Sequence, residues 1–160
     1  MPHAVALSRV DRRILECAWP RVAAALAWKS AGPNISIPQI KAAVFAGTSD
    51  LWIAPDWRFP TRLSSVIVTT ISAIARGKKV LRVHLLSGRH IGTWIDSAAC
   101  TLGSFAQANG CTRLSLIGRR GWMEYRNRFG LPTTWTTEEA GSAYNHHHGT
   151  AGVLGSKHPE

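Results

Sequence analysis

Several features that mark other classes of protein are missing from this sequence of 160 residues. No run of residues is long and apolar enough to span a bilayer, and the start, MPHAVALSRVDRR, lacks the order of charged, apolar and small residues found in signal peptides. We therefore expect no membrane span and a location in a cytoplasm, or in a particle assembled there. A hydrophobic content of 45% excludes a disordered chain, and the length suits one domain.

Cysteine is also scarce. Cys17, Cys100 and Cys111 are odd in number, far apart and without a CxxC pair or metal-ligand spacing. We expect three reduced thiols, mostly buried, and no catalytic cysteine. The tract Asn145–His148, NHHH, has adjacent imidazoles, but no acidic or cysteine partner lies at a useful spacing. We interpret it as a solvated tract and predict no metal site.

Acidic residues are few, with 9 Asp and Glu against 19 Lys and Arg, which gives a formal net charge of +10. Such a charge favours anionic partners: nucleic acid, a phosphorylated cofactor or an acidic protein surface. A soluble, arginine-rich surface is the plain alternative. The aromatic residues are dominated by seven Trp, against two Tyr and four Phe. Tryptophan is enriched at interfaces, although several of these residues are expected in the core.

The first half of the chain predicts two helical regions and a short strand. Apolar residues recur at helical steps from Leu7 to Trp28, with a break expected near Trp19 because Pro20 follows. A second helix begins at Ser36, where a capping box with Gln39 is predicted. This helix is predicted to end at Gly47. A short strand is predicted over DLWIAP, residues 50–55.

The second half predicts the rest of a mixed sheet. Two strands, RLSSVIVTTISAIA and VLRVHLLS, flank the turn RGKK and form an antiparallel hairpin. Helices are predicted over Ile91–Asn109 and Arg119–Phe129, and strands over TRLSLIG and TTWTT. The unit from Val80 to Ile117 predicts a right-handed parallel crossover. The fold class is therefore α/β (α+β), with an irregular Gly- and His-rich tail over residues 136–160 after a domain of residues 1–135.

This order of elements resembles the GNAT (N-acetyltransferase) superfamily. The segments that carry the resemblance are VLRVHLLSGRHIGTWIDSAACTLGSFAQANGCTRLSLIG and RRGWMEYRNRFGL. The first is similar to the strand–loop–helix–strand core of the superfamily, and the second to its late helix. The resemblance implies a mixed, splayed sheet in which a central strand parts from its parallel neighbour to admit acetyl-CoA.

A subgroup of GNAT-like proteins, encoded among the virion genes of tailed bacteriophages, resembles the chain more closely. The similar segments are IKAAVFAGTSDLWIA, KVLRVHLLSGR and GCTRLSLIGRRGWMEYRNRFGL, and the resemblance covers about Pro20 to Leu131. It implies a protein of the virion, present in the host cytoplasm during assembly, that contacts other virion proteins in an oligomeric assembly.

The GNAT resemblance also implies a pyrophosphate-binding loop, here SGRHIGTW, in which Gly88, Arg89 and Gly92 would face acetyl-CoA. The physical basis is a tight turn whose N–H groups, with the helix dipole, face an anion. The closely spaced glycine and small residue that usually follow are replaced by Thr93 and Trp94, and the helical period places Trp94 on the apolar face of the helix that follows.

For catalysis, the resemblance implies a carboxylate base and a late-helix tyrosine as acid, here Tyr125, whose simpler role is core packing. No Asp or Glu occurs in residues 62–75, and Asp50 and Asp56, which flank them, are typical turn residues. We therefore find no convincing base, and no catalytic residue is assigned unless the protein is active.

The late helix carries Arg119, Arg120, Arg126 and Arg128, which we expect to project outward beside the apolar residues of the same helix. A DNA-recognition helix is the sharper alternative, but a strand rather than a helix precedes it. These arginines and Trp57, in the loop DWRFPT, are the candidates for partner contact. Contact with DNA would be non-specific and directed at phosphates.

We predict from these features a bacteriophage virion or virion-assembly protein that uses a GNAT-like scaffold for contacts, without catalysis and without a cofactor. The alternative hypothesis is an acetyl-CoA-dependent N-acetyltransferase. Calorimetry with acetyl-CoA distinguishes the two.

Overall fold

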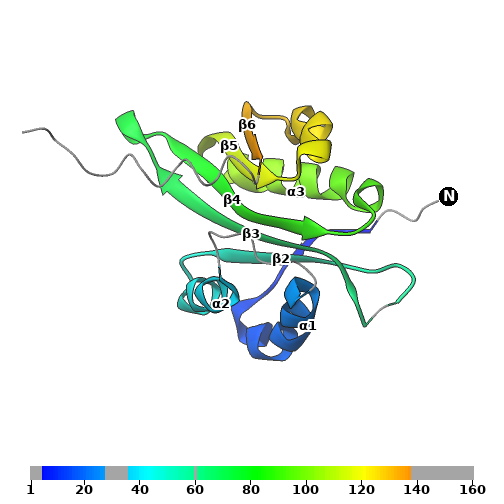
Figure 1. The fold of residues 1–160 in the computed structure, drawn as a ribbon. Helices are drawn as coiled ribbons and strands as arrows, with labels where there is room; N and C mark the ends of the chain where they lie inside the picture. Colours follow the sequence, from blue (N-terminus) through cyan, green and yellow to red (C-terminus); the bar gives the residue numbers. More distant parts are fainter. Residues whose placement is uncertain (1–4, 28–35, 60, 138–160) are drawn as a thin grey trace, which may run out of the picture.

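A computed structural model describes residues 5–27, 36–59 and 61–137 of the chain. Six strands form one mixed sheet whose spatial order is the same as the order of the strands in the chain. The strands are antiparallel from β1 to β4, whereas β4, β5 and β6 are parallel to one another (Figure 1). Their bounds are β1 (Ser8–Arg9), β2 (Asp50–Pro55), β3 (Leu63–Ala73), β4 (Lys79–Gly88), β5 (Cys111–Gly118) and β6 (Thr133–Thr137).

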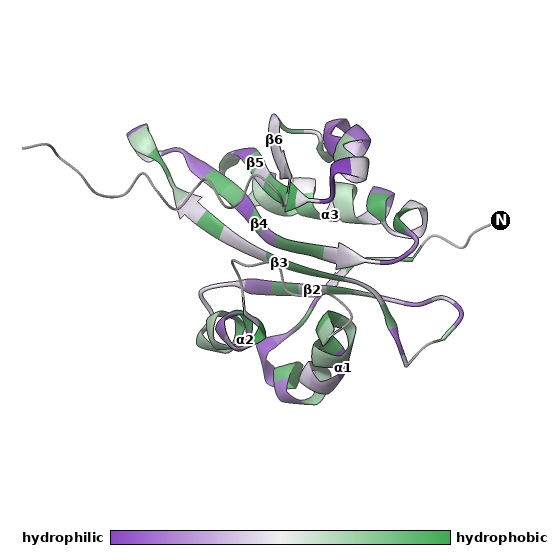
Figure 2. Ribbon diagram, in the orientation of Figure 1, coloured by the Kyte–Doolittle hydropathy of each residue, from purple (hydrophilic) through white to green (hydrophobic). Residues whose placement is uncertain are grey.

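Helices cover both faces of this sheet (Figure 1). The helices α1 (Leu15–Ala27) and α2 (Ile37–Ala46) lie on one face, while α3 (Ile95–Ala108) and the 3-10 helix η4 (Arg120–Phe129) lie on the other. Each layer encloses its own hydrophobic core. In Figure 2, η4 is drawn mostly in the purple of hydrophilic residues, whereas α3 is paler and greener. The sheet therefore separates an α1–α2 side from an α3 side, and the site described below depends on that division.

Local sequence signals account for most of these elements. At the start of α2, Ser36 Oγ accepts a hydrogen bond from the Gln39 N–H, and the Gln39 side chain accepts one from the Ser36 N–H. Gly47 ends α2 with a φ of 77°, a conformation that glycine adopts without steric cost. The predicted capping box is confirmed, as are the strand at 50–55, the β3–β4 hairpin, and the strands β5 and β6.

The first predicted helix is wrong in two respects. The chain is extended at Ser8–Arg9, which pair with β2, and a 3-10 turn at residues 12–14 precedes α1. The helix α1 then continues through Pro20 without the predicted break. Pro20 is exposed, and its missing N–H removes one hydrogen bond from the helix. The buried side chains of Trp19 and Val22 hold the helix against the sheet despite this loss.

Two later helices also differ from the prediction. Residues 91–93 form a 3-10 turn, and α3 begins only at Ile95 because Trp94 has a φ of −126°. The segment after β5 is a 3-10 helix, in which Phe129 is buried and Trp122 and Tyr125 are half-buried.

The expectation of mostly buried thiols is wrong for two of the three cysteines. Cys17 and Cys100 are exposed on α1 and α3, and only Cys111, at the start of β5, is buried. Burial raises the pKa of the Cys111 thiol, against a smaller opposing effect of Lys79.

No helix in the described ranges has the length and apolar character needed to cross a membrane. β6 extends to Thr137, past the predicted domain boundary at residue 135. The remainder of the predicted tail, including the NHHH tract, lies outside the described residues.

Candidate functional site

The two central parallel strands part before β4 ends. Their residue pairs run from Lys79 opposite Cys111 to Val83 opposite Leu116, and β4 then continues to Gly88 paired only with β3. A β-bulge in the β3–β4 pairing lies at the same level, between Val68 and Thr69 of β3. Because a bulge bends its strand, it helps to turn the end of β4 away from β5. The sheet is therefore splayed, as the resemblance implied.

A groove of about 710 Å³ lies at the end of β4 against α1. Its walls come from α1, the β2–β3 loop, the first residues of β3, the last residues of β4 and the residue that follows β5. This volume suits a small organic molecule. The lining residues are Pro20, Arg21, Ala24, Ala25, Asp56, Arg58, Phe59, Thr61, Arg62, Leu63, Ser64, Ser65, Val66, Ser87, Gly88, Arg89 and Arg119.

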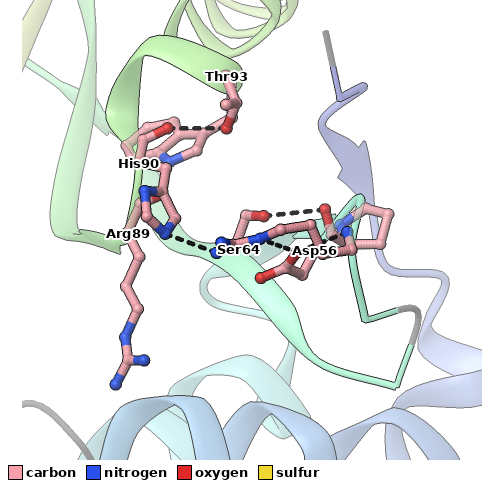
Figure 3. Close-up of polar contacts among 8 residues, drawn as sticks. Asp56, Ser64, Arg89, His90 and Thr93 are labelled. Atoms are coloured by element: carbon pink, nitrogen blue, oxygen red, sulfur yellow. Dashed lines mark hydrogen bonds and ion pairs between the residues drawn. The ribbon is translucent and has the colours of Figure 1, made fainter. Parts of the chain in front are cut away.

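Arginine dominates the charge of this groove. Of the lining residues that belong to the described part of the chain, five are arginines (Arg21, Arg58, Arg62, Arg89 and Arg119) and Asp56 is the one carboxylate. The arginines come from four separate parts of the fold: α1, the β2–β3 loop, and the ends of β4 and β5. In Figure 3 the Arg89 side chain runs away from His90 toward the helices drawn in blue. The groove therefore favours anionic ligands.

The single carboxylate is held by its neighbour Arg58. Asp56 Oδ1 accepts the Arg58 N–H at 2.8 Å and lies 3.8 Å from Arg58 Nε. The backbone N–H of Arg58, with smaller charge effects of Arg58 and His90, lowers the pKa of Asp56 below its ordinary 3.8. Asp56 is therefore a weak base at neutral pH, and its position agrees with the expected turn role.

Arg58 also bridges to the loop after β4. Its Nη2 lies 2.8 Å from His90 Nε2 (Figure 3). Since a guanidinium can only donate, His90 Nε2 must accept, which places the imidazole proton on Nδ1. The contact links the β2–β3 loop to the loop that carries Arg89 and fixes one wall of the groove.

The loop after β4 folds mainly on itself. Its N–H groups at Arg89, Thr93 and Trp94 donate to Ser64 O, His90 O and Ile91 O at 2.8, 2.9 and 3.2 Å. The Trp94 side chain is fully buried, as its helical period predicted, and its Nε1 donates to Arg89 O at 2.8 Å. The turn is completed by His90, whose φ of 52° is rare for a residue other than glycine.

The two glycines of this loop differ in their surroundings. A Cβ on Gly88 would lie 2.6 Å from Ser64 O and 2.8 Å from the Trp94 ring, whereas a Cβ on Gly92 would meet open space. Gly88 is therefore required by packing. Gly92 leaves an open approach to the turn, as a bound anion needs.

These contacts test whether the pyrophosphate of acetyl-CoA fits the loop. The N–H groups of Thr93 and Trp94 are already bonded inside the turn, so they are not aimed at an anion. Positive charge at this point comes instead from Arg89 and Arg119, which follow the parted ends of β4 and β5. The residues present fit an anion mainly through these guanidinium groups and the open turn at Gly92.

The other predicted residues lie apart from the groove. Tyr125 packs against the core on the α3 side, under the guanidinium of Arg128, which is 4.7 Å from the ring centre. Arg128 also pairs with Asp96 at 2.5 Å, and Arg120 and Arg126 are exposed on η4. Of the four arginines predicted for partner contact, Arg119, which precedes η4, is the one among the described lining residues; its guanidinium lies over the Trp122 ring. The roles assigned to these residues from the sequence stay predictions.

The sequence reasoning missed Arg21, Arg58 and Arg62 as members of one site. A signal for two of them exists: in the segment WRFPTR, Arg58 and Arg62 alternate with Trp57 and Phe59, an arrangement typical of ligand-binding loops. The Arg58 and Arg62 guanidinium groups lie 5.9 and 4.9 Å from the centre of the Phe59 ring. Nothing in the local sequence around Arg21 distinguishes it from a solvated helix residue.

Trp57 stays a candidate contact residue at the rim. It is 48% exposed, and the Arg58 guanidinium lies 5.6 Å from its ring centre. In the described ranges, no group of three or more His, Cys, Asp or Glu side chains is arranged to hold a metal ion.

The splayed sheet and the helical layers define the class of fold, and comparison with known proteins agrees. No protein-family model matches the sequence, and no curated protein matches it. Solved structures of acetyltransferases do match, at identities that establish the fold alone. The chain has the fold of GNAT acetyltransferases.

Three of these structures illustrate the match. Glucosamine-6-phosphate N-acetyltransferase from Arabidopsis thaliana aligns with a TM-score of 0.56 at 7% identity, over 99% of this chain and 100% of its own. An aminoglycoside acetyltransferase from an uncultured soil metagenomic sample, in complex with sisomicin, aligns with a TM-score of 0.55 at 8% identity, over 97% of each chain. A predicted acetyltransferase with acetyl-CoA from Clostridium acetobutylicum aligns with a TM-score of 0.53 at 10% identity, over 81% of this chain and 91% of its own.

Proposed function

We propose that this protein is an acyl-CoA-dependent N-acyltransferase of the GNAT type. The observation that carries the proposal is the parting of β4 from β5 after Val83 and Leu116, next to a groove of about 710 Å³. Beyond the β-bulge, the stretch of β4 from Leu85 to Gly88 pairs with β3 on one side only. Its other edge therefore has main-chain groups for an amide-bearing, extended ligand to pair with. Acetyl-CoA is such a ligand, and it would supply the activated acyl group.

The groove favours acyl transfer to an amine without a dedicated base. A primary amine must lose a proton before its nitrogen can attack the acyl carbon, and nearby positive charge lowers the pKa of an ammonium group. The five groove arginines supply that charge. The released proton passes to solvent, while the C–S bond breaks and the thiolate leaves. The arginines thus orient an acceptor and favour its reactive, neutral form.

Calorimetry with acetyl-CoA tests the proposal. We expect a Kd below about 1 mM, which corresponds to roughly −4 kcal/mol. Gly92→Phe fills the open approach to the turn without meeting the core, so it should weaken binding about tenfold or more. Ala108→Phe is the matched control, because it adds the same ring at the exposed far end of α3. Absence of measurable binding to the wild-type protein would refute the enzyme.

A second candidate function is the one favoured from the sequence: a bacteriophage virion or virion-assembly protein that uses this fold for contacts with other virion proteins, or with DNA phosphates, without catalysis. Two observations support contacts in place of catalysis. The Thr93 and Trp94 N–H groups are bonded within the cofactor loop, and Arg120 and Arg126 of η4 are exposed. Detection of the protein by mass spectrometry in purified particles, together with acetyl-CoA binding no tighter than millimolar, would support this candidate over the enzyme.

A further inference from the structure

We infer that the groove binds an acyl acceptor in which an amine and a phosphate group belong to the same small molecule. The amine part of this inference rests on the proposed function, whereas the phosphate part rests on the groove alone. The observations that carry it are the charge of the lining, the way its arginines are held, and the hydroxyl group of Ser64 on its floor.

The charge of the lining is strongly one-sided. Five arginines face one carboxylate among the described lining residues, and that carboxylate, Asp56, already accepts the Arg58 N–H. Guanidinium groups match phosphate oxygens in shape and bind them through paired hydrogen bonds. A phosphate monoester carries between one and two negative charges near neutral pH and three terminal oxygens, so it can engage several arginines at once. A carboxylate has two oxygens and one negative charge, so it engages fewer of these arginines at once.

Several of the arginines are held in place by neutral groups. Arg21 Nε donates to Thr61 O at 3.2 Å, and Arg58 Nη2 donates to His90 Nε2. The guanidinium groups of Arg62 and Arg119 lie 4.9 Å from the ring centres of Phe59 and Trp122. The ring contacts restrict Arg62 and Arg119 without neutralising their charge, whereas Arg58 also pairs with Asp56, with Nε 3.8 Å from Oδ1. Less conformational entropy is then lost when an anion binds.

The floor of the groove offers a place for the amine. Ser64 and Ser65 are 3% and 1% exposed, and their hydroxyl groups donate to Pro55 O at 3.0 Å and to Ser87 O at 2.9 Å. A hydroxyl whose proton is engaged still has oxygen lone pairs that accept. Ser64, which lies on the same face of β3 as Val66 of the α1-side core, is therefore oriented as an acceptor for an N–H group, whereas Ser65 projects to the other face of the strand. They lie on β3 beside the end of β4, where the strands part.

The shape of the groove favours a small molecule over a nucleic acid. It lies between α1 and the β2–β3 loop, and its volume of about 710 Å³ is that of a small-ligand pocket. The loop itself is closed by hydrogen bonds from the Asp56 N–H to Arg62 O at 2.9 Å and from the Arg62 N–H to Phe59 O at 2.8 Å. The wall is thus a turn with its own internal support.

Calorimetry without acetyl-CoA tests this assignment. O-phosphoethanolamine is the probe, because it joins an amine to a phosphate, and ethanolamine and inorganic phosphate are the comparison ligands. We expect O-phosphoethanolamine to bind about tenfold or more tightly than either comparison ligand. Arg62→Gln and Arg21→Gln should each weaken its binding about tenfold, since each removes one charge-assisted contact. Arg113→Gln is the matched control, because it removes one charge from an exposed position on β5 outside the lining, and it should change binding less than about twofold.

The outcomes separate this inference from the proposed function. Binding of O-phosphoethanolamine with no binding of acetyl-CoA would sustain the phosphate site and refute the acyltransferase. Equal binding of inorganic phosphate and O-phosphoethanolamine would overturn the assignment of the amine. Equal losses in all three arginine variants would overturn the groove as the site. A single-stranded DNA 20-mer that competes with the probe, and that binds more tightly even at high salt, would overturn the small-molecule ligand. Circular dichroism of each variant confirms that folding is retained.

Discussion

The ends of the two central parallel strands, β4 and β5, carry the same two residues in different surroundings. β4 ends at Gly88 followed by Arg89, and β5 ends at Gly118 followed by Arg119. In both places an indole occupies the position that a Cβ would take: the Trp94 ring would lie 2.8 Å from a Cβ on Gly88, and the Trp135 ring 2.6 Å from one on Gly118. Both arginines line the groove. Glycine thus admits a tryptophan under each strand end while the next residue presents its charge.

The two tryptophans differ in how their polar atoms are satisfied. Trp94 Nε1 donates to Arg89 O at 2.8 Å, and the ring meets Trp122 edge to face at 5.7 Å. Trp135 Nε1 is buried and has no hydrogen-bond partner among the described residues. A buried donor without a partner costs about 1–3 kcal/mol. The end of β4 is therefore the better-satisfied of the two corners, and it forms the floor of the groove.

Removal of the indole at the end of β4 should have the largest effect. Trp94 is 0% exposed, so Trp94→Ala is expected to lower the free energy of unfolding by about 3–5 kcal/mol. Urea unfolding followed by circular dichroism measures this change. Trp57→Ala removes an indole that is half exposed and should cost less than about 1 kcal/mol. Similar losses in the two variants would show that Trp94 does not anchor this corner.

Addition of one methyl group at each strand end compares the corners directly. Gly88→Ala should cost about 1–3 kcal/mol, because its Cβ would press on the backbone oxygen of Ser64 as well as on Trp94. Gly118→Ala should cost less, since the atoms nearest to its Cβ belong to the Trp135 side chain and not to the backbone. Gly92→Ala meets open space and should lie within about 0.5 kcal/mol of wild type. Thermal or urea denaturation gives this order, and a neutral Gly88→Ala would contradict it.

Replacement of the two buried indoles by phenylalanine isolates the polar difference. Trp94→Phe leaves Arg89 O without its donor and should cost about 1–3 kcal/mol beyond the lost ring area. Trp135→Phe removes a donor that has no partner in the described chain, so this polar cost should be absent and the net change within about 1 kcal/mol. Urea unfolding of the two single variants measures the difference in their free energies of unfolding. Equal costs would mean that Trp135 Nε1 is satisfied by a group outside the described ranges.

The smallest effect should appear in the pH dependence of stability, and it concerns His84 of β4. Burial, with added repulsion from Arg82, lowers the pKa of His84 from its ordinary 6.5. Below pH 6.5 the unfolded chain then binds a proton that the folded chain does not yet bind. The free energy of unfolding should therefore fall as the pH decreases from 6.5 toward the folded-state pKa. His84→Gln should flatten urea midpoints measured between pH 7.5 and 5.5, and an unchanged slope would exclude His84 as the source.

Local patterns were sufficient for most elements and for one feature of the loop. The capping box at Ser36 and the β3–β4 hairpin depend on residues close together in the chain, as does the inward direction of Trp94. The continuous α1 through Pro20 was not predictable in this way. Proline disfavours a helix interior locally, and only packing of Trp19 and Val22 against the sheet outweighs that cost.

The sequence by itself determined the class of fold, the excess of positive charge and the two Gly–Arg strand ends, because each is carried by residue type and short-range periodicity. Only the tertiary structure decided where the charge gathers. Arg21, Arg62 and Arg119 are far apart in the chain, and they line one groove because α1, the β2–β3 loop and β5 meet at the end of β4. Burial and hydrogen bonding in the folded state also decided that the Thr93 and Trp94 N–H groups are engaged inside their own turn. Such contacts depend on distances through space, which the order of residues does not specify.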